Sequence, residues 1–351
     1  MSQEQQTPHK RRVRYKGKYP KKFEEKYKEL QPEKYQETVE HVIRKGNTPA
    51  GMHISIMVKE ILDFLDIQPG QTGFDATLGY GGHTKAMLEC LKGKGHIYAT
   101  DVDPEESAKT KKRLEEQGFG EKILTVCLQN FCTIDEIAEK VGGFDFILAD
   151  LGVSSMQIDN PKRGFSFKAD GPLDLRLNQE KGISAAERLD TISREELAGM
   201  LYENSDEPYC EELAKAITDE IRRGNRIDTT TKLRNVIEKT LSFLPDNKEK
   251  KDIVKKTCQR TFQALRIDVN NEFEVLYEFM EKLPDALRPG GRVAILTFHS
   301  GEDKLVKKAL KAGYKAGIYS DYAKDVIRPS AQECAKNGRA RSTKMRWAVK
   351  A

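Results

Sequence analysis

The 351-residue sequence predicts an α/β fold, in which a mostly parallel sheet is covered by helices and a helical domain is inserted into the chain. Two observations lead to this expectation. From residue 53 onward, short apolar runs alternate with segments whose apolar residues recur at helical spacing. After residue 157 this alternation stops for about 100 polar and charged residues, too many for a loop within a compact domain. Alternating strands and helices are typical of a parallel sheet with helices on its faces.

The composition permits a nucleic-acid partner and argues against a membrane protein. The net charge of +5 and the pI near 8.6 are mildly basic. No apolar run approaches the roughly 18 residues of a bilayer span, and the first residues lack the apolar segment of a secretory signal. Six cysteines form no C-x-x-C pair and no cluster with metal-ligand spacing. We therefore expect reduced cysteines, no metal site and a cytoplasmic location.

Residues 1–48 form a basic N-terminal extension that differs from the rest of the chain. The segment Lys10–Lys22 holds eight basic residues and no acid, with Tyr15 and Tyr19 between them. Two interpretations stay open: a solvated tail, or an arm whose Lys and Arg contact RNA phosphates while the tyrosines stack on bases. A mitochondrial presequence fits less well, because such segments are amphipathic and rich in Arg and Ser. The mixed charges of residues 23–44 predict a helix.

The main domain begins with a predicted helix over 53–67, followed by a short strand that ends at Gly73-Phe74. The next residues are the glycine-rich stretch Asp75-Ala-Thr-Leu-Gly-Tyr-Gly-Gly-His83. Apolar residues then recur at helical spacing over 84–91. A strand, a glycine-rich turn and a helix in this order are the opening of a nucleotide-binding α/β unit.

The glycines of this loop indicate the class of ligand. Gly79, Gly81 and Gly82 lack Cβ atoms, so the loop can turn tightly and let a ligand approach backbone N–H groups. A dinucleotide fingerprint requires a glycine at position 84, where this chain has Thr84. The spacing suits the loop of a methyltransferase instead, in which an adenosine and an amino-acid carboxylate replace the pyrophosphate. A plain glycine turn before a helix is the alternative.

Two further strands end in candidate ligands for a nucleoside. The run over 96–100 ends in Asp101, which is placed to accept hydrogen bonds from two ribose hydroxyls. Phe131 follows the predicted strand over 123–127, and it either packs against an adenine or belongs to the core. Asp101 and the glycine loop together favour a bound nucleoside.

The candidate catalytic residues follow two later strands. The nearly continuous apolar run over 144–149 predicts a central parallel strand that ends in Asp150. Ligands of open α/β sheets bind at the carboxyl ends of the strands, so Asp150 should face the cleft unless it only caps the next segment. After a predicted turn at Pro289–Arg292, the strand over 293–297 leads to His299, which is either structural or directed toward the same cleft.

Residues 158–258 are interpreted as the inserted helical domain, which divides the main domain into 49–157 and 259–351. The residues over 213–221 have helical spacing, and Arg222 and Arg223 give this region a basic flank. We expect the inserted domain to cover the cleft and contact RNA. A charged surface without a ligand is the alternative.

Several motifs resemble the RsmH/MraW family of S-adenosylmethionine-dependent methyltransferases, and the resemblance extends from residue 53 to about residue 347. The motifs occur in the family's order: Leu78-Gly-Tyr-Gly-Gly-His-Thr84, Asp150-Leu-Gly-Val-Ser-Ser155, Arg163-Gly-Phe-Ser-Phe167, Asp170-Gly-Pro-Leu-Asp-Leu-Arg176 and Thr297-Phe-His-Ser300. The chain departs from the family in its basic N-terminal extension and at Gly301 and Lys304, where Leu and Arg are usual.

The resemblance implies a Rossmann-like class I methyltransferase domain that binds S-adenosylmethionine and methylates the exocyclic 4-amino group of a cytidine in bacterial small-subunit ribosomal RNA. The positions that match the family's donor-binding residues are Gly81, Gly82, His83, Asp101, Phe131, Asp150 and Gln157. The expected partners are ribosomal RNA or the small ribosomal subunit, with no membrane involved; a homodimer stays open.

Methylation of a cytosine amine requires help at the acceptor, because the amine shares its lone pair with the ring. Asp150 and the backbone carbonyls after it are the candidate hydrogen-bond acceptors, and His299 is a candidate to assist. Many amino-methyltransferases carry prolines after the acidic residue, and here Leu151-Gly-Val153 follows instead. Two alternatives remain: a ribosome-associated RNA-binding factor that retains the fold, and a paralogue that methylates another RNA.

Overall fold

The computed structural model describes residues 55–351, and the main domain is built on one seven-stranded sheet with the order β3-β2-β1-β4-β5-β7-β6. Strands β1 to β5 pair in parallel, whereas β7 is antiparallel to β5 and β6. The basic N-terminal extension and its predicted helix lie outside the described residues. The strands are β1 (Thr72–Asp75), β2 (His96–Asp101), β3 (Leu124–Leu128), β4 (Phe144–Asp150), β5 (Leu287–Thr297), β6 (Tyr319–Tyr322) and β7 (Lys344–Lys350).

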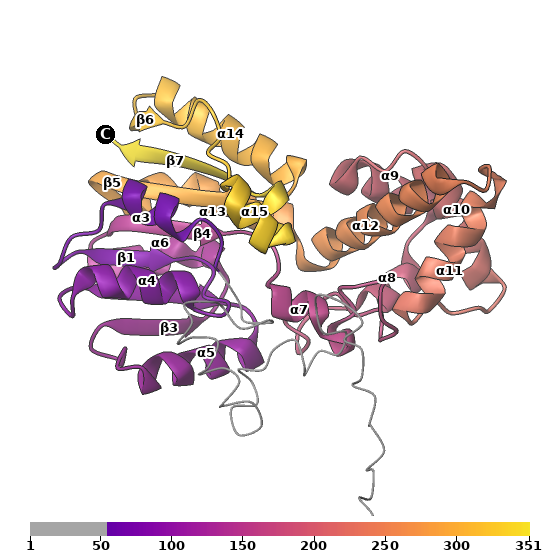
Figure 1. Ribbon diagram of the computed structural model, residues 1–351, viewed down its shortest axis with the longest axis horizontal. Helices are drawn as coiled ribbons and strands as arrows, with labels where there is room; N and C mark the ends of the chain where they lie inside the picture. Colours follow the sequence, from indigo (N-terminus) through magenta and orange to yellow (C-terminus); the bar gives the residue numbers. More distant parts are fainter. Residues whose placement is uncertain (1–54) are drawn as a thin grey trace, which may run out of the picture. The chain divides into compact units, whose positions relative to one another are not determined.

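Helices cover both faces of the sheet, because the strands bury apolar side chains on both sides (Figure 1). In β4, Ile147 and Ala149 contribute to one core, whereas Phe146 and Leu148 contribute to the other. The first core contains α6 (Ile134–Val141), α13 (Glu272–Ala286) and α14 (Ser300–Lys315). The second contains α3 (Val58–Leu65), α4 (Gly82–Leu91) and α5 (Pro104–Glu116). This α/β/α sandwich is the expected Rossmann-like architecture.

The predicted turn at Pro289–Arg292 is a bulge within β5. Phe144 pairs with Leu287, but Phe146 already pairs with Arg292, so the residues between loop out of the ladder. At this irregularity Phe144 and Phe146 contribute to opposite cores, although they are two residues apart.

The last strand, β7, was not predicted, because the sequence before and within it is strongly basic. Arg346 is 4% exposed, and its Nε donates to Asp303 Oδ1 over 2.6 Å. Lys344 Nζ donates to Asp303 Oδ2 over 2.8 Å. One carboxylate from α14 therefore pairs with both cations, which lowers the cost of burying Arg346 in a strand of the sheet.

The inserted region has its own apolar core, which extends from Phe165 to Leu265. Its helices pack on one another (Figure 1) and are α8 (Ala185–Thr191), α9 (Arg194–Ser205), α10 (Cys210–Arg222), α11 (Thr230–Thr240) and α12 (Lys248–Asn270). The predicted boundary at residue 258 falls inside α12, which continues to Asn270 and is followed directly by α13. The division into domains stays a prediction. Within residues 55–351, none of the helices combines the length and apolar composition that a bilayer span requires.

Candidate active site

The candidate site lies where the strand order of the sheet reverses. Strand β1 has β2 on one side and β4 on the other, so the connections after β1 and β4 diverge at this point. Ligands of open α/β sheets bind at such a switch point, outside the carboxyl ends of the strands. Asp75 and Asp150 occupy the ends of these two strands, and the Asp150 N–H donates to Thr77 Oγ1 over 2.8 Å.

Asp75 holds the glycine loop to the helix that follows it. Its side chain accepts hydrogen bonds from the Thr77 N–H over 3.0 Å and from the Thr84 hydroxyl over 2.7 Å. Burial raises the pKa of Asp75, although both hydrogen bonds oppose the shift. Thr84 therefore has a structural function at the position where a dinucleotide fingerprint has glycine.

Two loop glycines lie close against neighbouring side chains of the protein. Gly81 is the N-cap of α4 with φ of 76°, and a Cβ there would lie 2.8 Å from Thr110 Cγ2. A Cβ on Gly82 would lie 2.0 Å from Ser55 Oγ. At Gly79 the nearest atom to such a Cβ is 3.9 Å away. Gly79 is therefore the loop glycine with open space beside it.

Asp101 is tied to the glycine loop through its carboxylate. Its Oδ2 accepts from the Gly79 N–H over 2.9 Å, and its Oδ1 accepts from the Asp103 N–H over 2.9 Å. Burial raises the pKa of Asp101 to about 6, although these two N–H groups oppose the shift. A carboxylate has about four lone-pair sites, so two remain for ribose hydroxyls.

His83 and Asp150 form a partly buried pair. His83 Nδ1 lies 3.4 Å from Asp150 Oδ2, and His83 Nε2 lies 2.8 Å from the Ile56 carbonyl oxygen. Burial lowers the pKa of His83, but the hydrogen bond and charge of Asp150 and the Ile56 carbonyl outweigh this effect and raise it above its ordinary value. Asp150 Oδ1 is buried and has no hydrogen-bond partner among the described residues. One oxygen of Asp150 therefore pairs with His83, and the other has no partner among the described residues.

Gln157 belongs to a polar network around Asp103, the N-cap of α5. Gln157 Nε2 donates to Asp103 Oδ2 over 3.0 Å, and Arg163 Nη1 donates to the same oxygen over 2.6 Å. Arg163 is 5% exposed, and its Nη2 also donates to the Leu177 carbonyl over 2.7 Å. The Asp103–Arg163 pair was not predicted, although Arg163 opens one of the family motifs and Asp103 precedes the helix-starting Pro104.

Phe131 lies just after β3 and is half-buried. Its ring packs edge-on against Phe279, with centroids 5.2 Å apart. Both alternatives for Phe131 are compatible with this position, because the ring joins the core and keeps part of its surface exposed.

His299 lies at the N-terminus of α14 and contacts Glu302 through both ring nitrogens. Its Nδ1 caps the Glu302 N–H, and its Nε2 lies 3.1 Å from Glu302 Oε1 without the alignment of a hydrogen bond. The ligand atoms of Glu272, His299 and Glu302 lie within 4.8 Å of one another. Arg266 already pairs with both oxygens of Glu272, over 2.8 and 2.9 Å, so one of the two carboxylates in this cluster has a cationic partner. His299 follows β5, which is the neighbour of β4 in the sheet. Leu296 of β5 pairs with Asp150 of β4.

The residues at the switch point fit S-adenosylmethionine. Asp101 has acceptor capacity for a ribose, Gly79 has space beside its backbone, and Asp150 Oδ1 is a buried acceptor without a partner among residues 55–351. The other predicted residues serve as packing, capping or pairing groups within the protein.

The comparison with known proteins agrees with the motifs. The MraW methylase family matches residues 50–351. The chain is 85% identical over 351 residues to "Ribosomal RNA small subunit methyltransferase H 1" of Agathobacter rectalis, covering 100% of both chains. It is 69% identical over 350 residues to the protein of the same name from Lachnoclostridium phytofermentans, covering 100% of this chain and 95% of that one. It is 38% identical over 303 residues to "Ribosomal RNA small subunit methyltransferase H" of Koribacter versatilis, covering 85% and 94%. The chain belongs to the MraW methylase family.

Proposed function

We propose that this chain is an S-adenosylmethionine-dependent methyltransferase that acts on the exocyclic 4-amino group of a cytidine in small-subunit ribosomal RNA. The observation that carries the proposal is the buried, unpartnered Oδ1 of Asp150 at the carboxyl end of β4, beside the glycine loop. Family membership and the printed names of the relatives support the substrate.

The donor site comprises the predicted residues Gly79, Gly81, Gly82, His83, Asp101, Phe131, Asp150 and Gln157. When bound, S-adenosylmethionine supplies a methyl group that is already activated by its sulfonium. Asp101 accepts hydrogen bonds from the ribose, and Gly79 allows close approach to the backbone. Gln157 acts indirectly, because its amide holds Asp103 beside Asp101.

Asp150 acts on the acceptor. Its free oxygen accepts a hydrogen bond from the cytosine N4–H, which directs the nitrogen lone pair away from the ring and toward the methyl group. With the donor bound, the N4–H proton would move to Asp150 Oδ1 as the methyl group passes to N4, and the donor would leave as the neutral thioether. His83 holds the other Asp150 oxygen and so orients the carboxylate. His299 is a positioning residue in this proposal, because both of its ring nitrogens face Glu302.

The target base must be unstacked or single-stranded to present its amine, and the inserted helical region is proposed to contact the RNA around it. A cytoplasmic location and a homodimer belong to the same proposal, and light scattering of the purified chain tests the dimer. An RNA-binding factor without turnover would have no use for an acceptor oxygen beside a donor loop.

The test combines product mapping with one substitution. Small-subunit RNA from cells that lack the protein is incubated with the chain and labelled S-adenosylmethionine, and the nucleosides are analysed by mass spectrometry. We expect N4-methylcytidine at a single position. Asp150→Asn should lower the single-turnover rate at saturating donor and RNA by about 10²-fold, the lower range for a lost proton acceptor. Label on another base contradicts the substrate, and a full rate in Asp150→Asn leaves Asp150 only a donor ligand.

A further inference from the structure

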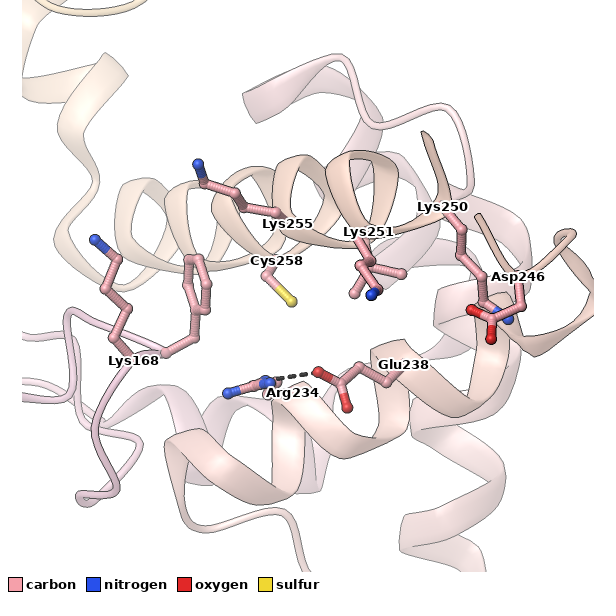
Figure 2. A pocket seen from close by; sticks show the side chains of 10 residues that line it. Lys168, Arg234, Glu238, Asp246, Lys250, Lys251, Lys255 and Cys258 are labelled. Atoms are coloured by element: carbon pink, nitrogen blue, oxygen red, sulfur yellow. Dashed lines mark hydrogen bonds and ion pairs between the residues drawn. The ribbon is translucent and has the colours of Figure 1, made fainter. Parts of the chain in front are cut away.

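We propose that a basic pocket in the inserted region binds a second nucleotide of the substrate RNA, distinct from the cytidine that is methylated. The inference rests on the proposed function, because it takes RNA as the substrate. The pocket has a volume of about 430 Å³, within the range of small-molecule binding sites. It lies between α11 and α12 (Figure 2) and is lined by Phe167, Lys168, Arg234, Glu238, Asp246, Lys250, Lys251, Val254, Lys255 and Cys258.

The charge of the pocket favours a phosphate. Five basic and two acidic side chains line it, and the Arg234 guanidinium pairs with Glu238 over 2.7 Å. Lys168, Lys250, Lys251 and Lys255 form no ion pair with any carboxylate of the described residues. Figure 2 shows Lys168 at one end of the pocket and Lys250 at the other. Uncompensated lysines gathered around one cavity create a positive field that attracts an anion.

The floor of the pocket favours a base. Phe167, Val254 and Cys258 provide apolar surface between the lysines. The Phe167 ring is held edge-on against Phe262, with centroids 5.7 Å apart, so it is fixed before a ligand arrives. Burial raises the pKa of Cys258 to about 12, so this thiol remains neutral and adds to the apolar floor. An aromatic ring among cations is the arrangement that binds a base and its phosphate in single-stranded nucleic acids.

A short segment connects the pocket with the candidate active site. Arg163 is bound to Asp103, which donates its N–H to Asp101, and Phe167 follows Arg163 by four residues. Four residues span at most about 14 Å even when fully extended. The pocket is therefore joined to the Asp101 side of the candidate site by a short segment, and one RNA strand is proposed to reach both. An acidic peptide would engage the lysines but has no planar base for the apolar floor.

The lysines are tested by RNA binding of the full chain. Filter binding of a small-subunit RNA transcript is measured over a range of salt for the double variant Lys251→Gln, Lys255→Gln. We expect affinity to fall about tenfold and the slope of log affinity against log salt to decrease by about 1.4, the value for two phosphate contacts on a single strand. The control Lys248→Gln, Lys256→Gln removes the same charge from exposed positions of α12 outside the pocket. Equal losses of RNA affinity in both double variants would overturn the proposal that the pocket binds a nucleotide.

The floor is tested by Phe167→Leu, which retains apolar bulk and loses the aromatic face. We expect RNA affinity to fall about fivefold or more, in line with the loss of one stacked base. Its affinity for S-adenosylmethionine, measured by calorimetry, should be unchanged, which verifies that the variant is folded. If this variant does not fold, the double lysine variant still tests the proposal. Unchanged RNA affinity contradicts the proposal.

Two competitor measurements identify the source of the ligand. Cytidine 5′-monophosphate that binds the pocket as tightly as RNA would indicate a free-nucleotide site and overturn the proposal. Polyglutamate that displaces RNA from the original chain but not from the lysine variant would indicate an acidic protein partner and also overturn it. These measurements record binding alone, so they test the pocket whether or not the chain methylates RNA. RNA binding without methylation of any RNA would refute the proposed function but would leave the test of the pocket valid.

Discussion

Three buried or partly buried carboxylates at the edge of the sheet have different partners, and the partners decide their functions. Asp75 is engaged by Thr77 and Thr84 and serves the loop. Asp101 accepts two backbone N–H groups and retains capacity for a ligand. Asp150 pairs with His83 through one oxygen and leaves the other without a partner in the described part of the chain. In the proposed function, the same residue type is thus structural, ligand-binding or catalytic according to how many donors the fold supplies.

Donor binding should depend on the ionisation of Asp101. Its folded-state pKa of about 6 lies above the ordinary value of 3.8, so the folded carboxyl takes up a proton as pH falls through about 6. The protonated form is a weaker acceptor for ribose hydroxyls. We expect the calorimetric affinity for S-adenosylmethionine to be constant well above pH 6 and to fall up to about tenfold per pH unit below it.

The variant Asp101→Asn separates this effect from the titration of other groups such as His83. It should bind the donor more weakly at neutral pH and show no break near pH 6. A break of the same size in Asp101→Asn would assign the pH dependence to another residue.

Strand β1 shows how closely side chains of neighbouring strands pack on one face of the sheet. A Cβ added to Gly73 would lie 2.0 Å from Cε2 of Phe146, whose side chain is fully buried. Gly73 therefore makes room for an aromatic ring of the neighbouring strand β4. The departure Gly301 in α14 has a similar cause, because a Cβ there would lie 2.6 Å from Phe273 Cζ and 3.2 Å from His299 Nδ1.

Gly73→Ala should destabilise the protein, because the buried Phe146 ring has no space into which it can move. We expect the free energy of unfolding to fall by about 1–3 kcal/mol, the usual cost of overpacking a core. Urea denaturation followed by circular dichroism measures the change. Gly120→Ala is the matched control, since a Cβ there meets nothing within 4 Å, and it should change stability by no more than about 0.5 kcal/mol. Equal stabilities of the two variants would refute the packing argument.

At the scale of the whole molecule, positive charge is concentrated in the basic N-terminal extension. The MraW methylase family matches from residue 50, so this extension precedes the matched region. The Agathobacter rectalis relative nevertheless aligns over all 351 residues. The extension is thus shared with at least one relative.

Deletion of residues 1–22 should weaken RNA binding and flatten its salt dependence, because eight basic residues are lost. Affinity for S-adenosylmethionine should not change, since the candidate donor residues all lie beyond residue 78. Filter binding over a range of salt and calorimetry measure the two quantities. An unchanged salt slope would favour the solvated tail over the RNA-contacting arm.

The sequence by itself determined the features that depend on local pattern. The apolar runs predicted β1 to β5, and the position of Asp101 and Asp150 directly after such runs placed both at the carboxyl edge of the sheet. The glycine loop was predictable because the conformational freedom of glycine is a property of the residue itself. These features need no knowledge of which strands become neighbours.

Only the tertiary structure decided which of these residues meet. Arg163 reaches Asp103 across 60 residues of sequence, and His83 approaches Asp150 only because β1 and β4 are neighbours in the sheet. The basic strand β7 fits into the sheet because Asp303 of a distant helix pairs with Lys344 and the buried Arg346. Such pairs depend on buried charges finding partners that are remote in sequence, and periodicity carries no information about them.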